Sequence, residues 1–102
     1  MKRTPIRKVS LNQKRLIARD ILFRSQIMKR DLGCVVSGYG DHDGPLDCCH
    51  VKPKGSHPSL RHDPVNAMIM CRSHHRWAHR EPIGFKTWFR ETYPTRAEAL
   101  NL

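Results

Sequence analysis

Two histidines, His75 and His79, are spaced so that both could bind one metal ion. Residues 72–80 are expected to form a helix, and side chains four positions apart on a helix point from the same face. Imidazole nitrogens presented in this way suit a transition-metal ion. Exposed helical histidines are common, so the pair alone indicates little. It gains weight from His50 on a predicted strand, from Asn66, and from a nearby segment rich in cysteine.

The order His50, Asn66, His75, with His79 one helical turn later, resembles the HNH endonuclease motif. The phrase CCHVKPKG…LRHDPVNAMIMCRSHHRWAH is similar to the small phage and prophage members of that family, and the similarity covers roughly residues 34–88. It implies an α+β fold with a small ββα-metal core. It also implies a metal-dependent DNA endonuclease that hydrolyses phosphodiester bonds, nicking or cutting duplex DNA with loose specificity.

The resemblance implies a role for each motif residue. His50 would be the general base that deprotonates the attacking water, since an imidazole titrates near neutral pH. Asn66 would orient His50 through hydrogen bonds across the intervening loop. His75 and His79 would hold one divalent ion, Mg²⁺, Mn²⁺ or Zn²⁺, at the scissile phosphate. No small organic cofactor is expected.

The residue just before the general base departs from the family pattern. Relatives often carry Asp or His there as a further metal ligand, whereas this chain carries Cys49. Cys49 is either a ligand of the active-site metal or a small buried residue, and the poor affinity of thiolates for magnesium favours the buried thiol. Asp47 is a fallback ligand, although we expect that the strand pleat would have to break locally for it to reach.

The resemblance also suggests a structural zinc site. Many relatives carry two Cys-x2-Cys pairs, and the corresponding residues here are Cys34 with Ser37 and Cys71 with His74. Serine is a poor zinc ligand, so three ligands remain, with Cys48 a conceivable fourth. Either the zinc site is rearranged, or it is lost and both cysteines are simply buried. The serine at position 37 favours the second interpretation.

Three other histidines are given no chemical role. His42 lies in a predicted turn and is expected to do nothing special, while His57 and His62 are expected to be exposed or to brace the loop.

The net charge of +10 is concentrated in the first third of the chain. Residues 1–30 hold ten Lys/Arg and one acid, a balance of +9, while residues 31–102 hold nine and eight, a balance of +1. Such a segment attracts polyanions, so nucleic acid is the leading candidate partner, although a solvated basic tail, a ribosomal role or a membrane-surface role would also fit the charge. The family resemblance implies that the partner is DNA. Basic side chains that flank the motif are expected to contact phosphates: Lys52, Lys54, Arg61, Arg72, Arg76 and Arg80.

Two other function classes compete with the nuclease. A non-catalytic, zinc-stabilised DNA-binding module of the same fold would not need His50 facing a metal. A ribosome-associated basic protein would explain the charge but not the ordered His/Asn/His/His set. No secretion signal or membrane-spanning run is seen, and the expected compartment is the cytoplasm of a bacterial or phage-infected host cell, with the chain a monomer or dimer.

A basic flexible arm (1–10) and a single nuclease domain (11–102, core 34–81) are expected. Ser10 can cap a long N-terminal helix from 11 to about 29, and further helices should follow the core at the C-terminus. The apolar face of the first helix is expected to pack in the core: Leu16, Ile17, Ile21, Phe23, Ile27 and Met28. A short strand and turn are expected in 34–44, followed by strands at 46–51 and 66–70 with a functional loop between them. Helices are expected at 72–80 and 82–91, with their aromatic side chains in the core, and a short helical turn should follow Pro94.

Overall fold

The computed structural model describes residues 9–102. The chain begins with helix α1 (Leu11–Asp31), and the predicted cap is present, since the Ser10 hydroxyl accepts a hydrogen bond from the Gln13 N–H and the Gln13 side chain bonds back to the Ser10 N–H. The helix ends where Leu32 adopts a left-handed conformation with φ 65°. Apart from Val9 and Ser10, the predicted basic arm lies outside the described residues.

Two antiparallel strands form the centre of the fold. β1 (Leu46–His50) pairs with β2 (Ala67–Cys71) in an unbroken register from Leu46 opposite Cys71 to His50 opposite Ala67. Because successive side chains of a strand point to opposite faces, Asp47 and Cys49 share one face, whereas Cys48 and His50 share the other. The loop between the strands contains two short 3-10 turns, η1 (Pro58–Leu60) and η2 (Pro64–Asn66).

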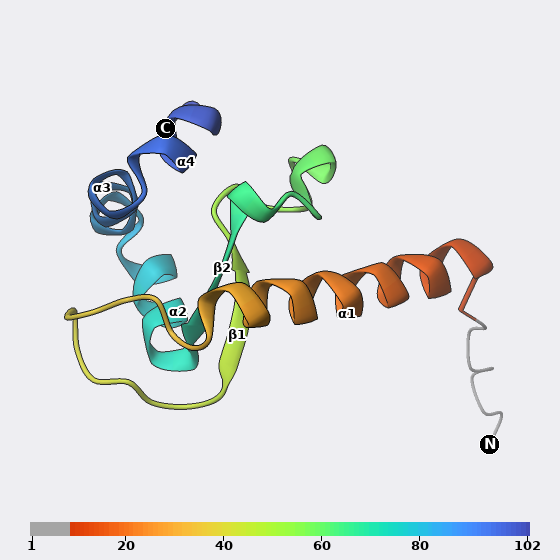
Figure 1. The fold of residues 1–102 in the computed structure, drawn as a ribbon, viewed down its shortest axis with the longest axis horizontal. Coiled ribbons are helices and arrows are strands. Elements are labelled where there is room, and N and C mark those ends of the chain that lie inside the picture. Colours follow the sequence, from red (N-terminus) through yellow and green to blue (C-terminus); the bar gives the residue numbers. More distant parts are fainter. Residues whose placement is uncertain (1–8) are drawn as a thin grey trace, which may run out of the picture.

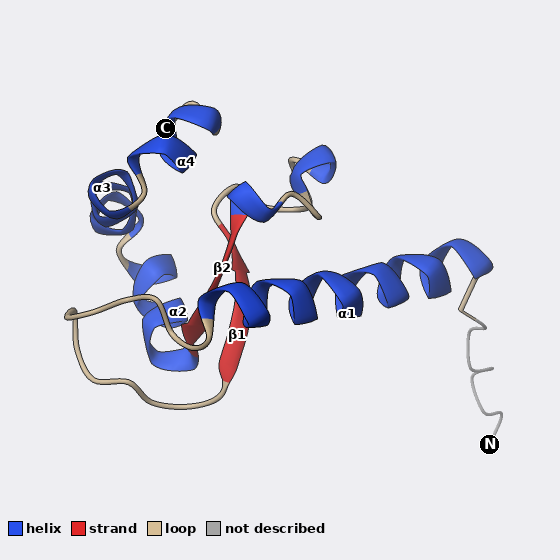
Figure 2. Ribbon diagram, in the orientation of Figure 1, coloured by secondary structure: helices blue, strands red, loops and turns tan. Residues whose placement is uncertain are grey.

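Helices cover both faces of this small sheet (Figures 1 and 2). On one face, Phe23 and Ile27 of α1 pack against Ala67 and Ile69 of β2. The other face is covered by α2 (Arg72–Arg80), α3 (Pro82–Thr92) and α4 (Pro94–Ala99). This second layer holds the larger apolar cluster, which includes the four aromatic residues predicted to be core: Trp77, Phe85, Trp88 and Phe89. The α+β class with a long N-terminal helix and additional C-terminal helices is confirmed.

Three sequence-based expectations about the elements are wrong. Ile17 and Ile21 are 51% and 64% exposed, because both lie off the helix face that carries the buried Phe23 and Ile27. The N-terminal part of α1 also extends past the short sheet (Figure 1). Residues 34–44 form no strand; a single backbone bond, from the Val35 N–H to the Ile69 carbonyl, ties this segment to the sheet. Asn66 ends a 3-10 turn instead of beginning a strand.

Among the described residues, no helix is long and apolar enough to cross a membrane.

Candidate active site and metal centre

The predicted base and the two predicted metal ligands line one cleft. The cleft lies between α1 and α2 beside β1, and His50, His75 and His79 all contribute to its wall. β1 contributes His50 to the cleft, and α2 contributes His75 and His79. The tertiary structure therefore brings together the three imidazoles that the sequence separates by up to 29 positions.

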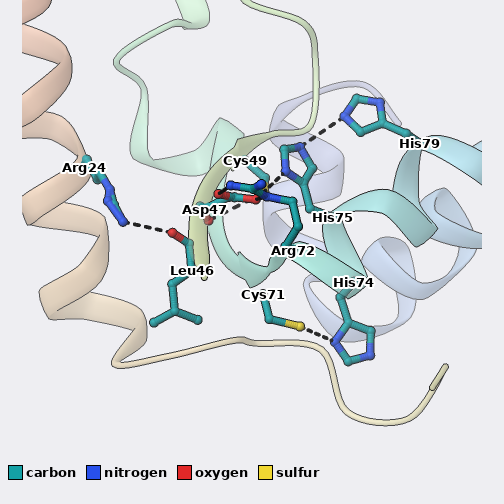
Figure 3. Close-up of polar contacts among 9 residues, drawn as sticks. All are labelled: Arg24, Leu46, Asp47, Cys49, Cys71, Arg72, His74, His75 and His79. Carbon is teal, nitrogen blue, oxygen red and sulfur yellow. Dashed lines mark hydrogen bonds and ion pairs between the residues drawn. The ribbon is translucent and has the colours of Figure 1, made fainter. Parts of the chain in front are cut away.

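His75 and His79 face each other on α2, with their Nε2 atoms 3.1 Å apart (Figure 3). Two nitrogens at right angles around an ion, each about 2.1 Å from it, are separated by about 3 Å, so the spacing fits two ligands of one metal. The other nitrogen of His75, Nδ1, lies 3.0 Å from Oδ2 of Asp47. A carboxylate can only accept, so Nδ1–H donates and the Nε2 lone pair of neutral His75 is directed toward His79.

Asp47 contacts His75 from a regular strand, without a local break in the pleat; its role as a fallback metal ligand stays a prediction. The pairing of β1 with β2 is continuous, and the face that carries Asp47 is the face on which α2 packs. Arg72, the first residue of α2, donates to both carboxylate oxygens at 2.7 and 3.0 Å. The Arg72 hydrogen bonds, with a further contribution from His75, lower the pKa of Asp47 to about 2 although burial acts to raise it, so the carboxylate is charged at neutral pH.

His50 makes one defined polar contact, with its Nε2 2.8 Å from the carbonyl oxygen of Arg61. Since a carbonyl only accepts, Nε2 carries the proton and the lone pair of the neutral ring is on Nδ1. Burial lowers the pKa of His50 below its ordinary value, outweighing the opposite effect of the Arg61 carbonyl. At neutral pH the ring is therefore unprotonated at Nδ1 and able to accept a proton.

Asn66 is completely buried and ties the loop together. Its side-chain oxygen accepts from the Lys52 N–H at 2.8 Å, and its amide donates to the carbonyls of Lys52 and Leu60 at 3.0 and 3.2 Å. Leu60 immediately precedes Arg61, whose carbonyl oxygen accepts the hydrogen bond from His50 Nε2–H. Asn66 is therefore linked to His50 through the loop backbone and not through a direct hydrogen bond.

Cys49 lies in the hydrophobic core, and its position does not favour the ligand interpretation. It is 4% exposed and belongs to the cluster that contains Met68, Met70 and Trp77. Its Sγ is 3.6 Å from the carbonyl of Asp47. Burial raises the pKa of this thiol far above its usual range, so the thiol is protonated in the absence of a metal ion.

The predicted DNA-contacting residues divide into two groups. Lys54, Arg72 and Arg76 line the cleft, and Arg80 lies with Arg76 beside an adjoining hollow. Arg61 is instead held by Asp20 of α1 through two hydrogen bonds of 2.9 and 2.6 Å. Lys52 is half-buried, and its backbone is bound by Asn66.

A second group of side chains has the composition of a metal site. Cys34, His42, Cys71 and His74 each offer one ligand atom, and all four atoms lie within 4.8 Å of one another. Nδ1 of His74 is 3.4 Å from Sγ of Cys34 and 3.2 Å from Sγ of Cys71 (Figure 3 shows the second contact). Among residues 9–102, this is the one place where three or more Cys, His, Asp or Glu side chains lie close enough together to hold a metal ion.

The orientation of His74 fits a metal ligand. Its Nε2 donates to the Gly38 carbonyl at 2.8 Å, which leaves the lone pair on Nδ1, the atom that faces both sulfurs. Burial acts to raise the pKa of Cys71, but the polar groups around its sulfur, including His74 and His42, lower it to about 6. The thiolate form is thereby favoured at Cys71, the residue immediately before α2.

His42 is the member of this candidate metal site that sequence reasoning missed. Its Nδ1 is 3.7 Å from Sγ of Cys71, whereas Cys48, the fourth ligand considered from the sequence, lies on the α1 side of the sheet beside Phe23 and Ile27. The interpretation in which the metal site is lost is not supported either, because the four ligand atoms converge. The only sequence signal was a histidine in a turn, which the spacing of the Cys pairs did not include.

Comparison with known proteins agrees with this geometry. A family model described as HNH endonuclease matches residues 34–86, more than half of the chain. The matched range contains His50, Asn66, His75 and His79 together with the Cys/His cluster, and it leaves α1 outside. Neither the curated proteins nor the solved structures include a match to this chain.

Proposed function

Because the chain belongs to the HNH endonuclease family, we propose that it is a metal-dependent DNA endonuclease that hydrolyses phosphodiester bonds, nicking or cutting duplex DNA with loose sequence preference. The observation that carries the proposal is the shared cleft of His50, His75 and His79, with Asp47 bonded to His75. A DNA-binding module without catalysis has no need for a neutral imidazole beside a pair of metal-ligating histidines.

His50 is the general base of the proposed reaction. Its Nε2–H is held by the Arg61 carbonyl, so the Nδ1 lone pair takes a proton from the water that attacks phosphorus. The lowered pKa keeps this nitrogen free at neutral pH. Asn66 maintains the loop that carries the carbonyl and is a positioning residue.

His75 and His79 would hold one divalent ion through their Nε2 atoms, and Asp47 would fix the tautomer of His75. When bound, Mg²⁺, Mn²⁺ or Zn²⁺ at this place would stabilise negative charge on the phosphate and on the leaving oxygen. Lys54 and Arg76 line the same cleft and would bind phosphates of the DNA backbone, contacts that do not read the base sequence.

A second ion, zinc, is proposed for Cys34, His42, Cys71 and His74. Two thiolates and two imidazoles form a four-coordinate set that zinc prefers and that magnesium does not. The cluster joins the irregular segment 32–45 to the first turn of α2, where backbone bonds from Ser73 N–H to the Asp43 carbonyl and from Arg72 N–H to the Pro45 carbonyl already meet. Zinc here would fix the helix that presents His75 and His79.

One experiment tests the catalytic assignment. Purified protein with Mg²⁺ or Mn²⁺ should convert supercoiled plasmid to open-circle or linear forms, and EDTA should stop the conversion. His50→Ala should abolish turnover and leave DNA binding intact, while His57→Ala, a histidine of the same loop outside the cleft, serves as the matched control. Equal activity of wild type and His50→Ala would refute the role of His50.

The alternative is a zinc-stabilised DNA-binding module without catalysis. One observation favours it: the Cys/His cluster offers four converging ligands, whereas the cleft offers two histidines and has a cysteine where relatives have a further ligand. This alternative predicts tight DNA binding, bound zinc and an intact plasmid in every divalent metal tested.

A further inference from the structure

Helix α1 lies outside the residues that match the HNH family, yet it forms one wall of the candidate active site. Asp20, Phe23 and Arg24 of α1 line the same cleft as His50, His75 and His79. Phe23 and Arg24 lie in the C-terminal half of α1, and Asp20 lies one turn before them, near the middle of the helix.

Asp20 binds the two residues of the loop that follow Leu60. Its Oδ1 accepts from Nε of Arg61 at 2.9 Å, its Oδ2 accepts from Nη2 of Arg61 at 2.6 Å, and Nε2 of His62 lies 2.7 Å from Oδ1. The Arg61 hydrogen bonds, with a further contribution from His62, hold the pKa of Asp20 well below its usual range despite partial burial. A charged carboxylate therefore fastens residues 61 and 62 to α1.

The backbone of Arg61 is the partner of the proposed base. Its carbonyl accepts the Nε2–H of His50 at 2.8 Å, so the position of Arg61 determines which ring nitrogen of His50 carries the proton. Phe23, one turn after Asp20 on α1, stacks on His50 with ring centroids 6.1 Å apart and meets His62 edge-on at 5.6 Å. The base is thus held by its carbonyl partner on one side and by an aromatic ring of α1 on another.

We propose that α1 completes the active site and that Asp20 is a positioning residue, which fixes the tautomer and orientation of His50 through the Arg61 backbone. The proposal rests on the nuclease function proposed above. Asp20 is not assigned as a metal ligand, because Arg61 and His62 engage both of its oxygens. It is the charge and bidentate geometry of the Asp20–Arg61 pair that set the carbonyl in place.

The kinetic test compares Asp20→Asn and Asp20→Ala with Glu91→Gln, which removes one negative charge from an exposed position on α3. We expect kcat for plasmid nicking to fall between about 10- and 100-fold in the Asp20 variants, because small displacements of a catalytic group are costly. KM should match that of Glu91→Gln, since the change in net charge is the same. If kcat of both Asp20 variants stays within twofold of Glu91→Gln, Asp20 does not position the base.

A spectroscopic measurement separates positioning from activity. Nitrogen-15 NMR of the His50 ring at a pH where it is neutral should show Nε2 protonated and Nδ1 unprotonated in the wild type, and a mixture of tautomers in Asp20→Ala. Asp20→Asn, nearly the same size as the native residue, decides the question if the alanine variant does not fold. An unchanged tautomer in the Asp20 variants would overturn the proposal, whether or not the protein cuts DNA. A tautomer shifted in the Asp20 variants, together with a wild-type protein that does not cut DNA, would uphold the positioning and refute the proposed function.

Discussion

The Nδ1 nitrogen of His75 lies 3.0 Å from the Oδ2 oxygen of Asp47, across 28 positions of sequence. This bond joins β1 to α2 and leaves the other nitrogen of His75 available beside His79. Arg72 donates to the same carboxylate, so strand, helix and proposed ligand are held as one unit (Figure 3).

Removing the Asp47 carboxylate should weaken metal binding. Asp47→Ala leaves His75 free to adopt either tautomer, and loss of such an outer-shell partner typically reduces metal affinity by about 10- to 100-fold. A titration of nicking rate against Mn²⁺ concentration measures the effect. Asp41→Ala, an exposed acid in the segment between α1 and β1, is the control, and an Mn²⁺ requirement equal in the two variants would contradict the role of Asp47.

The pH dependence of nicking should reflect the environment of His50. The ring must be unprotonated to accept a proton, so activity is lost as pH falls through its folded pKa. Burial lowers that pKa, with Lys54 and Arg61 acting in the same direction and the Arg61 carbonyl and Asp20 opposing. Activity should therefore persist below the ordinary histidine pKa of about 6.5 and disappear at a lower pH. A kcat profile with its acid midpoint above that value would contradict a buried base.

If the proposed zinc site is correct, substitutions of its cysteines and histidines should remove bound zinc, whereas substitutions of a cysteine and a histidine outside it should not. Cys71→Ser and His42→Ala should lose bound zinc, measured as metal per chain by elemental analysis, and should lower the melting temperature because metal binding contributes folding free energy. Cys48→Ser and His57→Ala should keep it, since neither side chain belongs to the cluster. Retention of zinc in His42→Ala together with its loss in Cys48→Ser would restore the ligand set first considered from the sequence.

The basic N-terminal residues should strengthen DNA binding without contributing to chemistry. Deleting residues 1–9 removes four Lys/Arg side chains, so the slope of log K against log salt concentration should decrease in magnitude by up to about four. A full-length chain with these four residues changed to Gln controls for the loss of length. An unchanged slope in both proteins would show that this segment does not contact DNA.

Much of the candidate site could be predicted from local sequence. The four-residue spacing of His75 and His79 fixes their common face, and the cap at Ser10 and the Pro82 helix start are local signals that act within one turn. The order His50, Asn66, His75 identified the family, which the matched range confirms. The helix spacing and the helix-start signals depend on residues close in sequence, so they can be predicted without knowledge of packing.

The remaining features depend on which segments meet in space. The sequence did not reveal that His42 joins Cys34, Cys71 and His74, because an irregular segment has no period from which its direction could be read. Nor could it show that Arg61 is held by Asp20 instead of being free for phosphate, or which face of α1 would meet the sheet and leave Ile17 and Ile21 exposed. Residue type and spacing determined the ligands that one helix can present; the packing of α1 and α2 on opposite faces of the strands decided their partners, because hydrogen bonds and metal sites require atoms within a few ångströms.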